Sequence, residues 1–269
     1  MMAFISLAER FKRRFLPIHH DAVYHPAESY YGSIYLDVIQ GQLAKLGERR
    51  LKILEAGCGT GRILVPLAKL GHELTGIDWH KDSLRLAKEN LSKVGEQANL
   101  YDGDLVKKLW EFPAAAFDAI LAIEVLYNCP QYKAVIARMS ELLQPGGYLL
   151  ISHRTRFYYL VQNLARKQFT DALYVARNKA GRLPKGQHRI YYNWQTSADL
   201  DELYGSAGMK ILLKYPIGPY SGFAPDPLET VCDPGKLSEN ERQLLREIEM
   251  NYDRETQMAA RYVLVVAQK

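Results

Sequence analysis

The stretch Leu51-Lys52-Ile53-Leu54-Glu55-Ala56-Gly57-Cys58-Gly59-Thr60-Gly61 decides the fold that we expect for this chain. Its first part is a short apolar run typical of a buried strand, and residues 63–70 follow a helical pattern that ends at Gly71. Glycines between a strand and a helix allow a sharp turn and let a ligand approach the backbone where no Cβ intervenes. The helix also begins with free N–H groups, so the sequence predicts a ligand-binding turn with the carboxylate of Glu55 beside it.

Strands and helices alternate in the sequence that follows this turn. Apolar runs that predict strands and amphipathic patterns that predict helices come in the order 73–78, 82–91, 117–124, 132–143 and 147–152. The apolar runs are continuous, which indicates strands that are covered on both faces. Helices of about 10–15 residues that alternate with strands imply right-handed crossovers, so the sequence predicts an α/β fold built on a parallel sheet.

The glycine-rich turn resembles the first motif of the class I S-adenosylmethionine-dependent methyltransferases, in which an acidic residue precedes three glycines. The matching residues here are Glu55, Gly57, Gly59 and Gly61, with Cys58 between the first two glycines. The dehydrogenase pattern G-x-G-x-x-G fits less well, because Arg62 occupies the place of its third glycine. The resemblance implies that the residues of this turn bind S-adenosylmethionine.

Two acidic segments further along the chain agree with this resemblance. Asp78 ends the second expected strand about 20 residues after the glycines, where nucleotide-binding folds place a ribose-binding acid. The resemblance implies that Asp78 accepts hydrogen bonds from the ribose hydroxyls and that Trp79 packs near the adenine. The segment Asp102-Gly103-Asp104-Leu105 is the second of these. Here the resemblance implies that Asp104 accepts a hydrogen bond from the adenine amino group and that Leu105 supplies a backbone N–H.

Two apolar blocks complete the resemblance, which covers about residues 51–153. Residues 117–126 are similar to the family's fourth-strand block, and residues 142–151 contain its LLQPGG turn. By this resemblance Glu124 lies near the sulfonium end of the donor. The segments 208–215 and 261–267 are similar to the family's antiparallel hairpin.

The fold that follows is a Rossmann-like α/β fold with a seven-stranded, mostly parallel sheet. One strand is antiparallel, helices cover both faces, and a helical cap is added. We expect one methyltransferase domain over residues 1–269. Its parts are an N-terminal helical lid (1–50), a donor-binding core (51–153), a basic cap insertion (154–192), and C-terminal strands with an inserted loop and helix (193–269).

Methyl transfer needs a base only where the acceptor must lose a proton early. His153 follows the strand at 148–152, at the edge of the sheet where ligands bind, and is the predicted catalytic base, with a solvated or core-edge histidine as the alternative. His19, His20 and His25 form a second set on the N-terminal segment. No metal site is expected, because these histidines lack ligand spacing with any cysteine or acid.

The acceptor is expected to bind among residues outside the donor-binding core. Tyr30, Tyr31, Tyr191 and Tyr192 suit a pocket for a flat small molecule, although a packing layer of tyrosines explains them as well. Residues 151–192 hold nine basic residues against one acid, Asp171. Arg154 and Arg156 in this segment suit an anionic acceptor, and nucleic-acid binding or a solvated surface are the alternatives.

We therefore expect an S-adenosylmethionine-dependent methyltransferase that acts at oxygen or nitrogen of a small acceptor, anionic or aromatic. An RNA or protein methyltransferase and a non-catalytic S-adenosylmethionine-binding protein are the alternatives. The chain has three cysteines and no C-x-x-C spacing, which indicates a reducing compartment without structural zinc. No apolar run reaches the about 18 residues that span a bilayer, so we expect a cytoplasmic protein whose oligomeric state the sequence leaves open.

Overall fold

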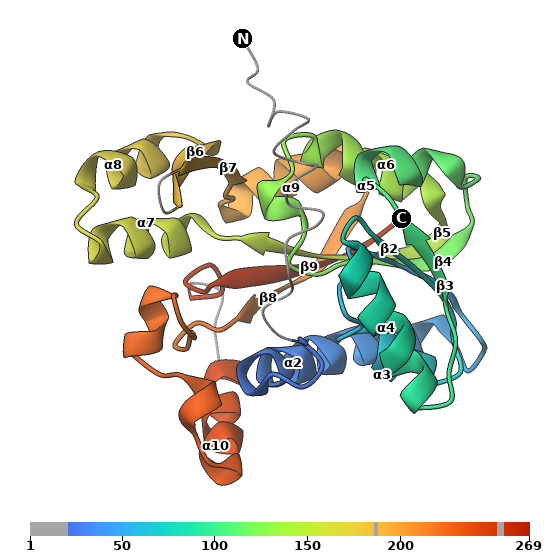
Figure 1. Ribbon diagram of the computed structural model, residues 1–269. Coiled ribbons are helices and arrows are strands. Elements are labelled where there is room, and N and C mark those ends of the chain that lie inside the picture. Colours follow the sequence, from blue (N-terminus) through green and yellow to red (C-terminus); the bar gives the residue numbers. More distant parts are fainter. Residues whose placement is uncertain (1–20, 186–187, 252–255) are drawn as a thin grey trace.

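The computed structural model describes residues 21–185, 188–251 and 256–269 (Figure 1). The first twenty residues of the expected N-terminal helical lid, which include His19 and His20, lie outside these ranges. Among the helices that are described, none has both the length and the apolar character needed to cross a membrane.

A seven-stranded sheet forms the centre of the molecule. Its strands lie in the order β3-β2-β1-β4-β5-β9-β8, and only β9 runs opposite to the others. The bounds are β1 (Lys52–Ala56), β2 (Glu73–Asp78), β3 (Asn99–Asp102), β4 (Phe117–Ala122), β5 (Leu143–Arg154), β8 (Lys210–Ile217) and β9 (Tyr262–Gln268). The expected seven-stranded, mostly parallel sheet is confirmed, including the antiparallel pairing of β8 and β9.

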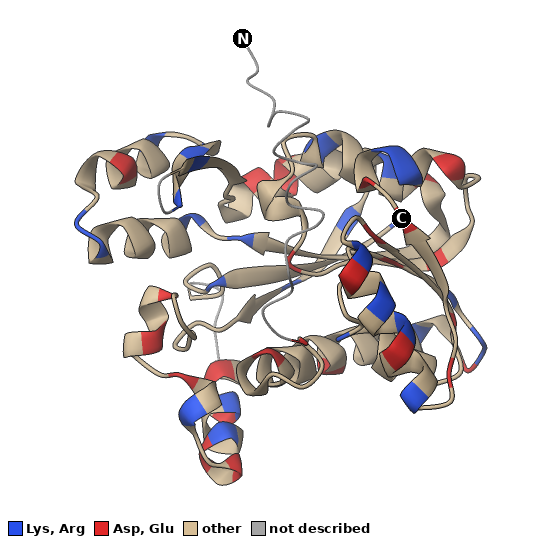
Figure 2. Ribbon diagram, in the orientation of Figure 1, with Lys and Arg blue, Asp and Glu red and all other residues tan. Residues whose placement is uncertain are grey.

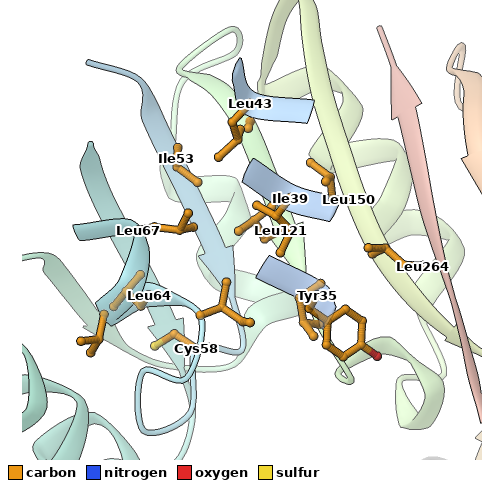
Figure 3. Packing of buried hydrophobic residues seen from close by; sticks show 14 of the residues in the cluster. Tyr35, Ile39, Leu43, Ile53, Cys58, Leu64, Leu67, Leu121, Leu150 and Leu264 are labelled. Atoms are coloured by element: carbon orange, nitrogen blue, oxygen red, sulfur yellow. The ribbon is translucent and has the colours of Figure 1, made fainter. Parts of the chain in front are cut away.

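Both faces of the sheet are buried, as the continuous apolar runs predict. All six residues of β4 are buried, and alternate residues contribute to two different hydrophobic clusters. Leu121, Leu150 and Leu264 lie in one cluster (Figure 3). Ile120 and Leu149 lie in the other, so adjacent residues of one strand pack on opposite faces.

Four helices pack on the face of the sheet that carries Leu121, Leu150 and Leu264. They are α2 (Pro26–Leu43), α3 (Leu64–Ala68), α4 (Lys81–Lys93) and α10 (Glu239–Met250). Tyr35, Ile39 and Leu43 of α2 point into the sheet cluster in Figure 3. Pro26 occupies the first turn of α2, where its missing N–H costs no hydrogen bond, and His25 caps the helix.

Shorter helices cover the other face and connect the strands. The second cluster includes residues of α6 (Tyr132–Leu142) and α9 (Ser197–Ser206), with α5 (Leu105–Lys108) beside it. The 3₁₀ helices are η1 (Ala44–Leu46), η2 (Leu109–Glu111), η3 (Leu126–Asn128), η4 (Pro227–Thr230) and η5 (Pro234–Lys236). A capping box begins α10: the side chains of Ser238 and Glu241 each bond the other's backbone N–H.

The basic segment after β5 forms a separate layer beyond the end of the sheet (Figure 1). It contains α7 (Arg156–Ala165), α8 (Phe169–Arg177) and a hairpin of β6 (Ala180–Lys185) and β7 (His188–Asn193). Tyr158, Tyr159, Val175, Leu183 and Trp194 form its own small core. The cap is thus only partly helical, and the ribbon in Figure 2 shows its basic positions spread over the helices, their connection and the hairpin.

Candidate functional site

A cavity of about 390 Å³ opens at the carboxyl ends of β1, β2 and β4. This is the edge where open α/β sheets bind ligands, because the strand ends and the following loops converge there. The residues predicted to bind the donor that line this cavity are Glu55, Gly57, Cys58, Gly59, Asp78, Trp79, Asp104, Leu105 and Glu124. The structure therefore brings together residues from three strand ends that are far apart in the sequence, from Glu55 to Glu124.

The turn after β1 requires glycine at Gly57. Its φ of 81° lies in the left-handed region, and a Cβ there would stand 2.3 Å from Cγ2 of Val125. Gly61 also has a positive φ, but it packs against Val65 and does not line the cavity. We infer that Gly61 shapes the turn, whereas Gly57 allows the turn to pack closely on Val125 at the cavity.

Asp78 ends β2 with its carboxylate at the cavity. Its Oδ2 accepts a hydrogen bond of 2.9 Å from the N–H of Gly59, and its Oδ1 accepts one of 2.8 Å from His80. Burial raises the pKa of this carboxyl, although the N–H groups of His80 and Gly59 oppose the shift. Each oxygen keeps a lone pair that a bound hydroxyl can use.

Glu55 is the most deeply buried acid of the cavity. Only 3% of it is exposed, and its Oε2 has no hydrogen-bond partner among the described residues. Burial raises its pKa to about 8, although the nearby guanidinium of Arg62 opposes the shift. A buried carboxylate oxygen without a partner is costly, so this position suits a polar or cationic ligand group.

Three residues that the resemblance assigns to the adenine, Trp79, Asp104 and Leu105, also line the cavity. Asp104 caps α5, with Oδ1 accepting a bond of 3.0 Å from the N–H of Val106, and Leu105 is the first residue of that helix. Trp79 follows Asp78 and keeps 37% of its surface exposed. An apolar plane and a carboxylate thus flank one end of the cavity, an arrangement that suits a heterocyclic base.

Sequence reasoning did not include Arg62 and Glu28 among the site residues, yet both line the cavity. Arg62 forms ion pairs with Glu28 of α2 and with Glu124, whose Oε1 lies 3.4 Å from its Nη2. Burial disfavours the charged form of Glu124, but the guanidiniums of Arg62, Arg261 and Arg154 lower its pKa overall. Only the mismatch of Arg62 with the dehydrogenase pattern drew attention to it in the sequence.

Glu124 adopts an unusual backbone conformation for a residue other than glycine. Its φ is 59°, and its N–H donates a hydrogen bond of 2.6 Å to the hydroxyl of Ser152 on β5. Such conformations cost free energy and occur frequently where a side chain must be aimed at a ligand. The structure places the Glu124 side chain on the cavity wall.

His153 does not lie at the cavity. It is 1% exposed, and its Nε2 is 2.9 Å from the hydroxyl of Tyr204 on α9, on the far face of the sheet. Burial lowers its pKa to about 3, so the imidazole stays neutral. The alternation of side chains along β5 turns His153 away from the ligand edge, and this geometry gives it a structural role rather than that of a base.

The residues expected to bind the acceptor separate into different environments. Tyr30 and Tyr31 are buried, and their hydroxyls bond Glu249 at 2.8 Å and Ser221 at 2.8 Å. Arg156 begins α7 and lies 3.8 Å from Asp199, away from the cavity lining. Tyr30, Tyr31 and Arg156 therefore already have protein partners in this structure.

Arg154 and the two tyrosines of β7, Tyr191 and Tyr192, belong to the group of residues around the loop that follows β4. The Arg154 guanidinium carbon is 3.8 Å from the ring centroids of both Tyr158 and Tyr262. Tyr192 stacks on Tyr127 with ring centroids 6.2 Å apart, and Tyr127 follows Glu124 by three residues. Tyr191 precedes Tyr192 on β7 and is half-buried. The hairpin thus reaches the loop that carries Glu124.

Comparison with known proteins agrees with this geometry. Residues 54–151 match the family described as methyltransferase domain. A ubiquinone biosynthesis O-methyltransferase from Nitrosococcus oceani is 30% identical over 176 residues, which cover 65% of this chain and 69% of the relative. One from Xanthomonas axonopodis is 29% identical over 178 residues, covering 66% and 69%.

Solved structures share the fold at low identity. A methyltransferase from Methanosarcina mazei superposes with a TM-score of 0.59 at 18% identity, covering 85% of this chain and 96% of that chain. The 1,6-didemethyltoxoflavin-N1-methyltransferase of Burkholderia thailandensis, solved with its substrate and S-adenosylhomocysteine, gives 0.58 at 16% identity, covering 100% and 93%. This chain belongs to the class I S-adenosylmethionine-dependent methyltransferases, and S-adenosylmethionine is its methyl donor.

The cavity fits this donor on features of its own. Gly57, Cys58 and Gly59 line it, the Glu55 carboxyl has a buried oxygen without a partner among the described residues, and Asp78 presents lone pairs at the end of β2. A nucleoside with an amino-acid tail needs such groups: acceptors for hydroxyls and for an ammonium, and a flat wall for a base.

Proposed function

We propose that this enzyme methylates an oxygen or nitrogen atom of a small-molecule acceptor. Two observations support this proposal. The curated relatives at 28–30% identity are named as O-methyltransferases of ubiquinone biosynthesis. The donor cavity continues toward Glu124, Asn128 and Cys129, where aromatic side chains from the cap and from β9 come together beside the ends of β4 and β5.

We assign the residues of the cavity to parts of the donor. Asp78 would accept hydrogen bonds from the ribose hydroxyls, with Trp79, Asp104 and Leu105 around the adenine. Gly57, Cys58 and Gly59 would form the backbone surface against the nucleoside. Glu55 and Glu124 would lie toward the amino-acid and sulfonium end, where carboxylates favour the positive charge of the donor.

When bound, S-adenosylmethionine supplies a methyl group that its sulfonium already activates. The chain therefore has to hold donor and acceptor in line and exclude water, and alignment alone contributes about 7–11 kcal/mol to lowering such barriers. Arg62 pairs with Glu28 and Glu124 on the cavity wall, and its charge lowers the pKa of Glu124. Where the acceptor loses a proton, these two carboxylates are better placed than His153 to receive it.

Titration calorimetry with S-adenosylhomocysteine tests the donor assignment. Asp78→Asn should weaken binding by about 10- to 100-fold, because it removes a charged acceptor for two hydroxyls. Asp82→Asn removes the same charge from an exposed position of α4 and should leave the affinity unchanged. Equal affinity of both variants, or no binding to the wild-type chain, would refute the assignment.

Methyl incorporation from labelled donor tests the acceptor assignment. We expect label in the small-molecule fraction of a cell extract, and in neither the RNA nor the protein fraction. Label that disappears after ribonuclease treatment would instead show that the basic cap serves nucleic acid.

A further inference from the structure

Two buried guanidinium N–H groups beside the proposed acceptor position have no hydrogen-bond partner in the described part of the chain. They are Nε of Arg154, at the end of β5, and Nη1 of Arg261, immediately before β9. Arg154 pairs with Tyr262 in the antiparallel register of β5 and β9, so the two arginines are near neighbours. Buried donors are nearly always satisfied, and a pair of orphans in one place indicates an absent partner.

Aromatic rings hold both guanidiniums in place without satisfying their N–H groups. Arg154 lies between Tyr158 and Tyr262, with each ring centroid 3.8 Å from its guanidinium carbon. The guanidinium carbon of Arg261 lies 4.5 Å from the ring of Tyr31 and 5.0 Å from that of Phe223. Contacts with ring faces do not satisfy the N–H groups, which point along the edges of a guanidinium, so the two buried N–H groups keep their capacity to donate.

The two arginines differ in whether a carboxylate forms an ion pair with them. Arg261 pairs with Asp226 at 2.8 Å, whereas none of the described carboxylates forms an ion pair with Arg154. Arg62 differs from both, because Glu28 and Glu124 already neutralise it. Glu124 compensates Arg154 only through space, without an ion pair, and the neighbouring charge of Arg261 repels it.

The position of the pair relates it to methyl transfer. Arg154 and Arg261 both act electrostatically on Glu124, which lines the donor cavity. An anion held by these arginines therefore lies next to the end of the cavity that we assign to the reacting methyl group. Apart from Asp226, which pairs with Arg261, the side chains recorded in contact with the two guanidiniums are aromatic, which favours a planar molecule.

We propose that Arg154 and Arg261 form an anion subsite that binds the carboxylate of a planar, aromatic acceptor. This inference rests on the proposed function, because it identifies the substrate class of the same site. A carboxylate oxygen accepts from each orphan N–H, neutralises Arg154 and separates the two cations. The subsite fixes one end of the acceptor, and so selects which oxygen or nitrogen faces the donor.

Calorimetric titration of benzoate and of benzamide tests this subsite, since the two probes share shape and differ in charge. With the chain saturated by S-adenosylhomocysteine, benzoate should bind about tenfold more tightly than benzamide. Arg154→Gln and Arg261→Gln should each abolish this preference. Arg85→Gln removes the same charge from α4, where the side chain is 59% exposed, and should keep the preference.

A second variant separates binding from folding. Arg154→Lys keeps the charge and loses the planar fork, so it should retain a weakened preference with a melting temperature near that of the wild-type chain. Equal affinities for benzoate and benzamide, no benzoate binding up to about 10 mM, or a preference that persists in Arg154→Gln would overturn the subsite. The titrations are repeated without S-adenosylhomocysteine, so a failure of donor binding refutes the proposed function while the benzoate result still decides the subsite.

Discussion

Arg62 Nη2 lies 3.4 Å from Oε1 of Glu124, and the same guanidinium pairs with Glu28. Arg62 follows the glycine-rich turn, Glu124 follows β4, and Glu28 lies in the first turn of α2. One cation thus joins three elements of the cavity wall that are distant in the sequence. Two carboxylates in one buried place are compatible only because this cation lies between them.

Removing this cation should destabilise the fold strongly. Arg62→Gln leaves Glu28 and Glu124 facing each other without a counter-charge, so we expect a loss of about 3–5 kcal/mol in the free energy of unfolding. Urea denaturation measures the change. The double variant Arg62→Gln/Glu28→Gln should recover part of it, and a loss below about 1 kcal/mol for the single variant would show that the network is unimportant.

A methyl group at Gly57 should abolish donor binding. The added Cβ of Gly57→Ala would collide with Val125 at 2.3 Å in a backbone conformation that alanine resists. We expect no measurable S-adenosylhomocysteine binding. Gly47→Ala is the matched control, because Gly47 has a φ of 94° but open space around it, so it should cost about 1 kcal/mol of stability and no affinity.

A compensating change can show that the collision, not the backbone strain, is the cause. Val125→Ala removes the atoms that the new Cβ meets, so Gly57→Ala/Val125→Ala should bind donor better than Gly57→Ala alone. If the double variant binds no better, strain in the turn dominates.

The buried carboxyl of Glu55 should make the ligand-free protein less stable as pH rises. Its pKa is raised to about 8 by burial, whereas the unfolded chain titrates near 4.3. Between these values the folded state holds a proton that the unfolded state has lost, so stability falls with increasing pH. Glu55→Gln should be more stable than wild type by about 1–3 kcal/mol at pH 8 and nearly equal at pH 4.

Urea titrations at several pH values measure this difference. A stability difference between the two proteins that stays constant from pH 4 to pH 8 would show that Glu55 titrates normally.

Substitution of His153 should affect stability and not methyl transfer. His153→Gln loses the contact with Tyr204, which should cost about 1 kcal/mol, while the rate of transfer stays within about threefold. Tyr204→Phe removes the same hydrogen bond from the other side and should behave alike. A fall in rate of about 100-fold or more in His153→Gln alone would restore the histidine as a base.

The pH dependence of stability offers a second measurement on His153. Burial lowers its pKa to about 3, so below the ordinary value near 6.5 the unfolded chain binds a proton that the folded chain does not. Stability should therefore be lost as pH falls from 6.5, and His153→Gln should lose less.

The sheet and the donor cavity could be predicted because their signals are local. Continuous apolar runs mark β1, β4 and β5, and glycines that must adopt positive φ mark the turn after β1. The hairpin of β6 and β7 has weaker local signals, because Gly181 and Pro184 interrupt the first strand and both strands carry arginines. Pairing across the hairpin stabilises it, including a bond of 3.1 Å from Arg182 to the carbonyl of Arg189.

The acceptor side depends on contacts that no local pattern contains. The sequence singles out Arg154 and Arg156 together, but the helical turn that begins at Arg156 directs its side chain toward Asp199. Arg261 lies more than one hundred positions away and becomes the neighbour of Arg154 only through the pairing of β5 and β9. Which tyrosines pack and which face a ligand is likewise decided by packing against α10 and the cap.

The hydrogen bond from Tyr30 to Glu249 joins residues 219 positions apart. Such a contact closes a longer loop than the pairing of β1 with β2 and β4, where Ile53 is 21 positions from Leu74 and 66 from Ala119. The wall around the proposed acceptor position therefore assembles late in folding and opens early in unfolding. Hydrogen exchange should find the amides of α10 less protected than those of β1 and β4.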